Sequence, residues 1–267
     1  MLYRRLKRLR VAVSVIFIVA LTVAVADAYF GASPVGRWLM SDMQLVPAIL
    51  AGSAAWIVIW VLVTITFGRV YCSTVCPLGT LQDGISRLGR AVAKPGRKDY
   101  RYTAPLDALR IPIPVAVGVC LLAGASVVVT ITDPFTLYRR LVMAVARPAA
   151  VGFGGMASAI IIILAISACS LRHGRIFCNT ACPLGGLLGL MGRSPLYRVD
   201  INTDKCIHCN KCEAVCKSEC IDLRTCVVDN SRCVMCLNCT AVCPNDAIIV
   251  RRGRHTLSTP MMQSINE

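Results

Sequence analysis

The most constraining feature of the sequence is a pair of matching cysteine runs near its C-terminal end. The first run consists of Cys206, Cys209, Cys212 and Cys216, and the second of Cys233, Cys236, Cys239 and Cys243. The runs repeat with a period of 27 residues, and each ends in Ala-Val-Cys. They differ at one informative position, where Lys217 stands in place of Pro244. This duplication predicts a small module with two equivalent halves.

The spacing of the cysteines predicts two cubic iron–sulfur clusters. Three cysteines at two-residue intervals wrap a tight loop around one 4Fe–4S cluster, and in two-cluster ferredoxins the fourth thiolate ligates the other cluster. The expected ligands of the first cluster are Cys206, Cys209, Cys212 and Cys243, and those of the second are Cys233, Cys236, Cys239 and Cys216. Zinc is the alternative, but structural zinc sites favour paired Cys-x-x-Cys or Cys/His sets. Lys217 leaves ligation possible, because proline there only pre-shapes the backbone.

The composition predicts that the rest of the chain is a membrane domain. The 267 residues are 56% hydrophobic and only 16% charged, which is unusual for a soluble domain. We expect a transmembrane domain over residues 1–198, a bacterial-type two-cluster ferredoxin domain over 199–254, and a polar tail over 255–267. The net charge of +15 comes from the loops beside the apolar segments, so it indicates membrane topology and contact with lipid rather than a nucleic-acid partner.

Four apolar segments, at residues 11–26, 45–68, 111–131 and 151–169, are the candidate membrane helices. The last three have about 19 to 24 residues, enough to cross a hydrocarbon core of about 30 Å. The expected fold is therefore a four-helix membrane domain built from a duplicated hairpin, joined to a small α+β ferredoxin domain. The first segment is alternatively a signal peptide cleaved after Ala24-Val25-Ala26, or a twin-arginine signal at Arg4-Arg5. Residues 138–146 suit a short amphipathic helix at the membrane interface.

The distribution of basic residues predicts the orientation. Residues 1–10 hold five Lys or Arg and residues 69–110 hold eight, whereas 31–44 hold one and 132–150 hold three. By the positive-inside rule, the N-terminus, the 69–110 loop and everything after residue 170 face the cytoplasm. The sequence thus predicts a multi-pass protein of the cytoplasmic (inner) membrane with a cytoplasmic ferredoxin domain.

A second cysteine motif occurs twice, at the ends of the second and fourth apolar segments. It reads Gly-Arg-aliphatic-aromatic-Cys-x-Thr-x-Cys-Pro-Leu-Gly, over residues 68–79 and 174–185. Its thiols belong to Cys72, Cys76, Cys178 and Cys182. Four-residue spacing puts both thiols of a motif on one face of a helix, and four thiols suffice for a third iron–sulfur cluster. Structural Cys-Pro turns and a reversible disulfide are the alternatives. Arg69 and Arg175 are expected to neutralise the thiolates or to meet lipid headgroups.

Together these motifs resemble the NapH-type family of membrane ferredoxin-type proteins, which is related to the NosR-type and CcoG-type proteins. The long extracytoplasmic flavin-binding domain of the NosR type is absent. The resemblance implies an oxidoreductase component, resembling a quinol dehydrogenase, that passes electrons between the quinone pool and other redox subunits. The CcoG resemblance implies an alternative, an assembly or maturation factor that reduces cupric ion or partner thiols. A docking subunit whose clusters only relay electrons within a larger complex is a third possibility.

Three further side chains near the runs are expected to have structural roles. Cys220 and Cys226 are predicted to pack near the clusters rather than to ligate them. His208 is predicted to be a loop or interface residue.

Overall fold

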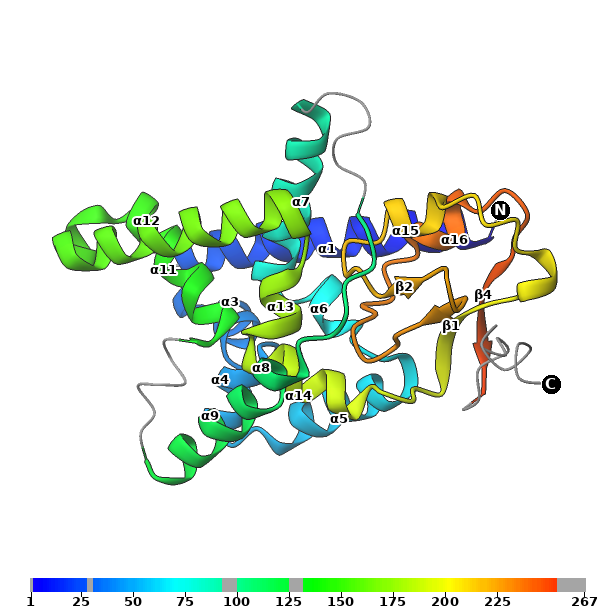
Figure 1. The fold of residues 1–267 in the computed structure, drawn as a ribbon. Coiled ribbons are helices and arrows are strands. Elements are labelled where there is room, and N and C mark those ends of the chain that lie inside the picture. The colour runs from blue at the N-terminus through cyan, green and yellow to red at the C-terminus, as the bar shows by residue number, and fades with distance from the viewer. Residues whose placement is uncertain (1, 28–30, 93–99, 125–131, 254–267) are drawn as a thin grey trace.

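The computed structural model describes residues 2–27, 31–92, 100–124 and 132–253 (Figure 1). A helical part extends to Met191, and a smaller part with short strands begins at Tyr197. The start of the first helix lies beside the smaller part, where the amide of Val250 donates a hydrogen bond to the Tyr3 hydroxyl at 3.2 Å. The predicted polar tail over 255–267 lies outside the described residues.

The first half of the helical part contains six helices among the described residues. They are α1 (Leu2–Ala26), α3 (Pro34–Met40), α4 (Leu45–Leu50), α5 (Ala54–Phe67), α6 (Tyr71–Thr74) and α7 (Pro77–Val92). The second half contains α8 (Asp107–Arg110), α9 (Pro112–Leu122), α11 (Pro134–Ala146), α12 (Pro148–His173), α13 (Ile176–Thr180) and α14 (Pro183–Met191). Each half therefore ends with a short helix that carries cysteines, a Cys-Pro step and a further helix.

Within the described part of the chain, two helices are long and apolar enough to cross a membrane: Leu2–Ala26 and Val151–His173 within α12. The predicted continuous helix over 45–68 is instead divided into α4 and α5. Gly52 occupies the break with a φ of +69°, a conformation that glycine adopts without steric cost. In the segment predicted over 111–131, α9 ends at Leu122, and residues 125–131 lie outside the described part.

The helix predicted over residues 138–146 is present as part of a longer helix, α11 (Pro134–Ala146), and its place at the membrane interface stays a prediction. Helix α11 begins earlier, at Pro134, and the Asp133 carboxylate caps it by accepting a hydrogen bond from the Thr136 amide at 2.8 Å. It packs against α12, α1 and α7, with Phe135 and Tyr138 buried. The apolar side of this helix therefore faces protein, because three neighbouring helices cover it.

The helices that follow the two Cys-Pro steps each contact the other half of the helical part. Helix α7 follows the first motif and contacts α11 and α12 of the second half, whereas α14 follows the second motif and contacts α5 of the first half as well as α9 of its own. The central apolar core includes Leu78 from α7, Leu184 from α14, and Trp60 and Tyr71 from the first half. This exchange brings the two cysteine motifs to the middle of the molecule (Figure 1).

The smaller part is built from paired short strands and two short helices. Strand β1 (Tyr197–Ile201) pairs antiparallel with β4 (Ile248–Arg252), and β2 (Ile221–Asp222) with β3 (Val227–Val228). The 3₁₀ helix η1 (Thr203–Lys205) precedes the first cysteine loop, and α15 (Lys211–Ala214) and α16 (Asn238–Val242) follow the two loops and contact each other.

The backbone repeats with the same 27-residue period as the cysteines. Positive φ angles occur at three pairs of non-glycine residues separated by that period: His208 and Met235, Asn210 and Leu237, and Glu219 and Asp246. Such angles are uncommon for residues with a side chain. The two halves therefore share the same tight loop, in which the chain turns sharply between consecutive cysteines.

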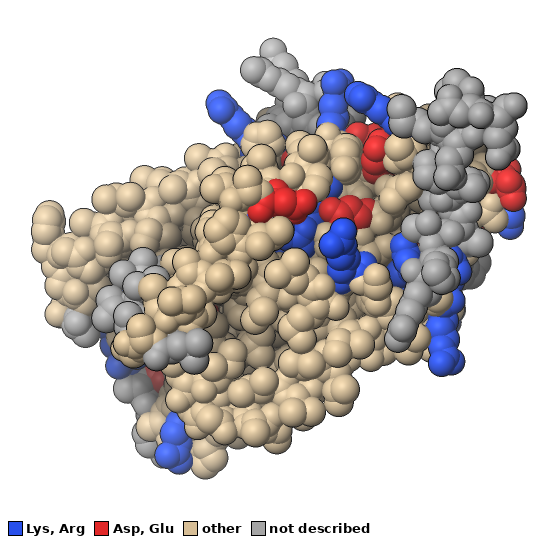
Figure 2. Space-filling model, turned by 60° about the horizontal axis from the view of Figure 1, so that its bottom comes forward, with Lys and Arg blue, Asp and Glu red and all other residues tan. Residues whose placement is uncertain are grey.

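The surface separates charged from uncharged regions. In the face shown in Figure 2, one broad part carries almost no Lys, Arg, Asp or Glu, while charged side chains gather elsewhere. Large apolar side chains on the long helices are exposed, among them Ile16 at 68% and Ile161 at 67%. Apolar surface of this extent marks a site of contact with lipid or protein.

Candidate iron–sulfur sites

The four cysteines predicted for the first cluster line one cavity. Cys206, Cys209, Cys212 and Cys243 surround it, together with apolar side chains that include Ile201, Leu223 and Ile248. Burial raises the pKa of the Cys212 thiol to about 12, and repulsion from the nearby Cys206 and Cys209 adds to the rise. The amide of Ala247 donates to the Cys243 sulfur at 3.3 Å. The fourth cysteine thus arrives from the other run, as the crossed ligand pattern requires.

The second predicted set lines a separate cavity in the same part of the chain. Cys216, Cys233, Cys236 and Cys239 surround it, with Cys220 and the apolar Val199, Ile221 and Val228. Burial raises the pKa of Cys239 well above its ordinary value, and the other three thiols of the set raise it further. The structure therefore brings together both predicted sets of four.

The chemistry of both cavities fits 4Fe–4S clusters. Four thiols crowded into an apolar shell cannot all ionise unless a positive centre joins them, because burial and mutual repulsion both oppose thiolate charge. Cluster irons supply that charge and bind thiolates, whereas backbone amides directed at sulfur tune the potential. Bound there, the clusters would accept and donate single electrons. The chain contributes the ligands, the apolar enclosure and the amide donors.

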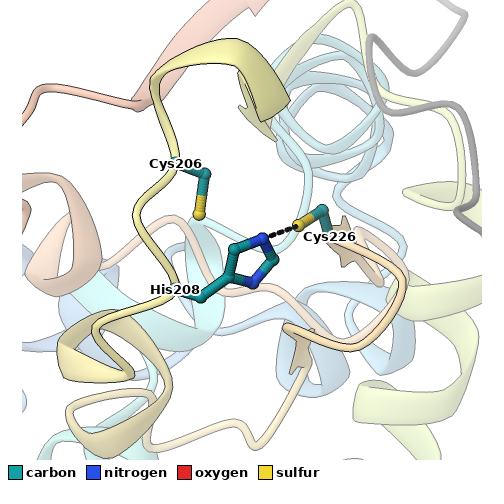
Figure 3. Close-up of side chains that lie close together, drawn as sticks. All are labelled: Cys206, His208 and Cys226. Atoms are coloured by element: carbon teal, nitrogen blue, oxygen red, sulfur yellow. Dashed lines mark hydrogen bonds between the residues drawn. The ribbon is translucent and has the colours of Figure 1, made fainter.

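Cys220, Cys226 and His208 lie against the predicted ligands. The Cys220 sulfur is 3.5 Å from that of Cys216, and both Cys220 and Cys226 are buried. Figure 3 shows Cys206, His208 and Cys226 converging, with the Cys226 sulfur 3.9 Å from Nε2 of His208. The ligand atoms of these three residues lie within 4.8 Å of one another. Because Cys206 belongs to the first predicted set, this trio is part of that site.

The structure also brings together Cys72, Cys76, Cys178 and Cys182, here called the cysteine quartet. All four are buried. Burial raises the pKa of Cys76 well above its ordinary value, and the other three thiols raise it further by repulsion. Burial also raises the pKa of Cys178 to about 11, although Arg175 and Arg69 act in the opposite direction. Cys182 caps α14, and its sulfur accepts a hydrogen bond from the Gly185 amide at 3.3 Å.

Each motif's arginine holds the backbone of the other motif. Arg69 donates to the Cys178 carbonyl at 2.9 Å, and Arg175 donates to the Cys72 carbonyl at 2.7 Å. Both side chains are fully buried, which excludes the predicted contact with lipid headgroups and leaves their role inside the site. The reciprocal bonds fix the distance between the motifs, so the quartet is held from both sides.

The glycines that end the motifs are required by the same close approach. A Cβ at Gly79 would lie 2.4 Å from the Cys72 carbonyl oxygen, and one at Gly185 would lie 1.9 Å from that of Cys178. Any side chain there would therefore push the following helix away from its cysteine. Leu-Gly after Cys-Pro is thus part of the site's construction.

A buried ion cluster joins the quartet to the second ferredoxin site. Asp83 on α7 contacts Arg175 at 2.9 Å and Lys217 at 2.6 Å. Burial alone would raise the pKa of Asp83, but the two cations outweigh it and hold that pKa well below its usual range. Lys217 directly follows Cys216, and its carbonyl accepts a hydrogen bond from the Arg175 amide at 2.9 Å. The residue that stands in place of proline in the first run therefore supplies the second cation of this cluster.

Further contacts connect the helical part around the quartet to the ferredoxin part. Asn179, within the second motif, accepts from Arg69 at 2.8 Å and donates to the Ser218 carbonyl at 3.0 Å. Arg110 donates to the hydroxyl and carbonyl of Ser231 at 2.8 and 2.6 Å. Val234 and Cys236 also pack into the core that holds the quartet. The quartet and the second cavity are therefore neighbours.

Sequence reasoning missed the acidic residues of the site, although two signals were present. Asp133 is the sole acidic residue between positions 108 and 199, and it follows Asp27 by 106 residues, the offset that also separates Arg69 from Arg175. Asp83 has no counterpart in the second half, where Gly189 stands. An isolated acid in an apolar stretch and an asymmetry between repeats were the available signals.

Comparison with known families supports iron–sulfur binding in both parts of the chain. A family described as "4Fe-4S binding domain" matches residues 49–95 and again 156–202, which contain the two halves of the quartet. A second family with the same description matches residues 226–249. The chain is thus confirmed as one that binds 4Fe–4S clusters, and the cysteine quartet falls inside matched segments.

Curated relatives give the same result. The ferredoxin-type protein NapH of Escherichia coli (strain K12) is 30% identical over 189 residues, covering 68% of this chain and 58% of the relative. The putative electron transport protein YccM of the same organism is 25% identical over 200 residues, covering 68% and 54%. The methylamine utilization ferredoxin-type protein MauN of Paracoccus denitrificans (strain Pd 1222) is 29% identical over 182 residues, covering 67% and 56%.

The chain spans somewhat more than half the length of these relatives. No solved structure matches it significantly. The resemblance to NapH-type ferredoxin-type proteins, and with it the binding of iron–sulfur clusters, is confirmed by these matches.

Proposed function

We propose that this chain is a membrane-bound electron-transfer protein that passes electrons between quinol and a redox partner through its cysteine sites. One observation carries the proposal: the quartet lies next to the second ferredoxin cavity, which lies next to the first. Lys217 spans the first of these junctions through Asp83, and it directly follows Cys216 in the chain. Contact of the short helices α15 and α16 spans the second junction. The quartet and the two ferredoxin cavities are thus three adjacent thiol sites, an arrangement that suits the stepwise transfer of single electrons.

In this proposal four apolar segments cross the cytoplasmic membrane. The two long helices span it directly, and α4 with α5, and α9 with the residues after it, complete the other crossings. The exposed apolar side chains of α1, α5 and α12 then face lipid, as Ile16, Leu62 and Ile161 illustrate. The excess of basic residues in the loops supports a cytoplasmic position of the ferredoxin part in this proposal.

The quartet holds a third iron–sulfur centre in this proposal. Its support is the convergence of four buried thiols from two equivalent motifs, two adjacent guanidinium groups and the amide donor of Gly185. A disulfide within the quartet would leave two thiols unused. The centre lies between the membrane helices and the ferredoxin part, so it is the entry point for electrons from quinol. The partner is a redox subunit that docks on the cytoplasmic side.

The proposal is tested by two reactions: reduction of the oxidised clusters by a quinol analogue, and oxidation of the reduced clusters by cupric ion. The protein is purified anaerobically, oxidised, and mixed with a quinol analogue while cluster absorbance is followed. We expect bleaching of the clusters by quinol. A reduced protein that instead transfers electrons to cupric ion, and shows no response to quinol, would indicate a metal-reducing maturation factor and would overturn the proposal.

A further inference from the structure

An apolar cavity lies between α4, α9 and α14, beside the second Cys-Pro step. Its volume is about 110 Å³, and its walls include Val46 and Ile49 from α4, Val117 and Leu121 from α9, and Leu184 and Leu187 from α14. These helices are neighbours in Figure 1. An engineered apolar cavity of roughly 150 Å³ takes up a benzene ring. The space therefore suits a single six-membered ring.

One carboxylate lines this otherwise apolar cavity. Asp133 is 1% exposed, and its Oδ2 accepts hydrogen bonds from the amide and hydroxyl of Thr136, both at 2.8 Å. Its Oδ1 is buried and makes no hydrogen bond among the described residues. A buried acceptor without a donor costs free energy, because the group has lost its hydrogen bonds to water. An occupant of the cavity that brings a hydroxyl group would remove that cost.

Polar groups lie between the cavity and the quartet. The Tyr71 hydroxyl accepts a hydrogen bond from the Leu45 amide at 3.2 Å, and the following residue, Val46, is part of the cavity wall. The Tyr71 hydroxyl donates to Oε1 of Gln44 at 3.2 Å, and Tyr71 immediately precedes Cys72. Phe177 holds the equivalent position in the second motif, so this half alone has the hydroxyl. The polar path is therefore specific to the side that carries the cavity.

We infer that this cavity binds the ring of a quinol, with Oδ1 of Asp133 accepting a hydrogen bond from one ring hydroxyl. The inference rests on the proposed function and assigns its substrate a place. The apolar walls contact the ring and the start of its tail, and Asp133 selects the reduced form, because a quinone carbonyl has no hydrogen to donate. A lipid acyl chain would fill the walls but leave Asp133 without a donor.

Binding to the full-length protein in lipid nanodiscs tests the inference without relying on turnover. The probes are decylubiquinol, decylubiquinone and 1-decanol, each titrated anaerobically by calorimetry. We expect the wild type to bind the quinol at least tenfold more tightly than the quinone, and decanol not to compete. Asp133→Asn keeps an oxygen to cap α11 but offers an amide donor, so it should lose or reverse the preference for quinol.

A pair of glycine variants supplies the steric control. A Cβ at Gly118 on α9 or at Gly154 on α12 meets no atom within 4 Å, but Gly118 alone lines the cavity. Gly118→Phe should lower quinol affinity at least tenfold, whereas Gly154→Phe should bind as the wild type does. Unchanged iron content in each variant verifies folding. A photoreactive azidoquinone should label peptides from α9 or α14 in the wild type and not in Gly118→Phe.

The outcomes separate this site from the broader proposal. Quinol that still reduces the clusters while both Asp133→Asn and Gly118→Phe bind it normally would refute this site and leave the proposed function standing. A wild type that neither binds quinol nor is reduced by it would remove both. Competition by decanol equal to that of decylubiquinol would assign the cavity to an acyl chain and refute the inference.

Discussion

Replacing Asp83 by asparagine should be one of the most damaging conservative changes in the chain. The carboxylate is the shared partner of Arg175 and Lys217, whose side chains are each 1% exposed. Asparagine fills nearly the same space but leaves two buried cations without a counter-charge. Removing one partner of a buried pair costs about 3–5 kcal/mol. At about 2–4 °C per kcal/mol for a chain of this size, the melting temperature should fall by roughly 6–20 °C.

Lys217→Met should cost much less than Asp83→Asn. Burial lowers the pKa of Lys217 to about 8 even though Asp83 raises it, so the site only partly offsets the desolvation of the ammonium. Methionine removes the unfavourable desolvation of the ammonium and leaves Asp83 paired with Arg175. Asp107→Asn, on the exposed start of α8, makes the same charge change and should stay within about 0.5 kcal/mol of wild type.

Thermal unfolding of the anaerobically purified protein in detergent, followed by tryptophan fluorescence and cluster absorbance, provides the measurement. The loss in Asp83→Asn should be constant between pH 5 and 7. The pKa of the Asp83 carboxyl is lower in the folded protein than in the unfolded chain, where it is about 3.9. Its ionised form therefore stabilises the fold fully at pH values above about 3.9, and this stabilisation is lost only as the pH falls below that value. An Asp83→Asn variant as stable as Asp107→Asn, or a Lys217→Met variant equally damaged, would refute the reasoning.

Three further predictions test other parts of the account. Gly185→Ala should detach α14 from the quartet and lower iron content, because its Cβ would lie 1.9 Å from a carbonyl oxygen, whereas Gly84→Ala, in open space on α7, should be neutral or slightly stabilising. Cys209→Ala and Cys236→Ala should each abolish one ferredoxin EPR signal and keep the other, and unchanged iron in both would contradict the ligand sets. A reporter at the C-terminus should be active only as a cytoplasmic form and one inserted near Ser41 only as an external form; reversed activities would invert the topology.

The ferredoxin part could be predicted closely because its chemistry is local. Cysteine spacing alone specified two loops, and the structure shows the same period in the backbone angles at His208 and Met235. The duplicated Cys-Pro motifs were equally visible. The break at Gly52 was not, because an apolar run reads as continuous until a glycine with positive φ divides it.

Contacts between distant segments could not be read from the sequence. Lys217 registered only as a missing proline, and its partner Asp83 lies 134 residues away on a helix whose docking depends on the whole core. Arg69 and Arg175 were placed near the thiolates, but their exchange between motifs required the pseudo-symmetric packing of α7 and α14. Asp133 was missed because a single acid beside an apolar segment looks like a loop residue.

The central claim, that electrons from quinol enter through the cysteine quartet, is tested most directly by one rapid-mixing experiment. Wild-type protein and a Cys76→Ser, Cys182→Ser double variant are mixed anaerobically with a quinol analogue, and the EPR signals of the ferredoxin clusters are recorded after freezing. The account predicts reduction in the wild type, and in the variant two clusters that dithionite reduces but quinol does not. Reduction of the variant by quinol at the wild-type rate would contradict it.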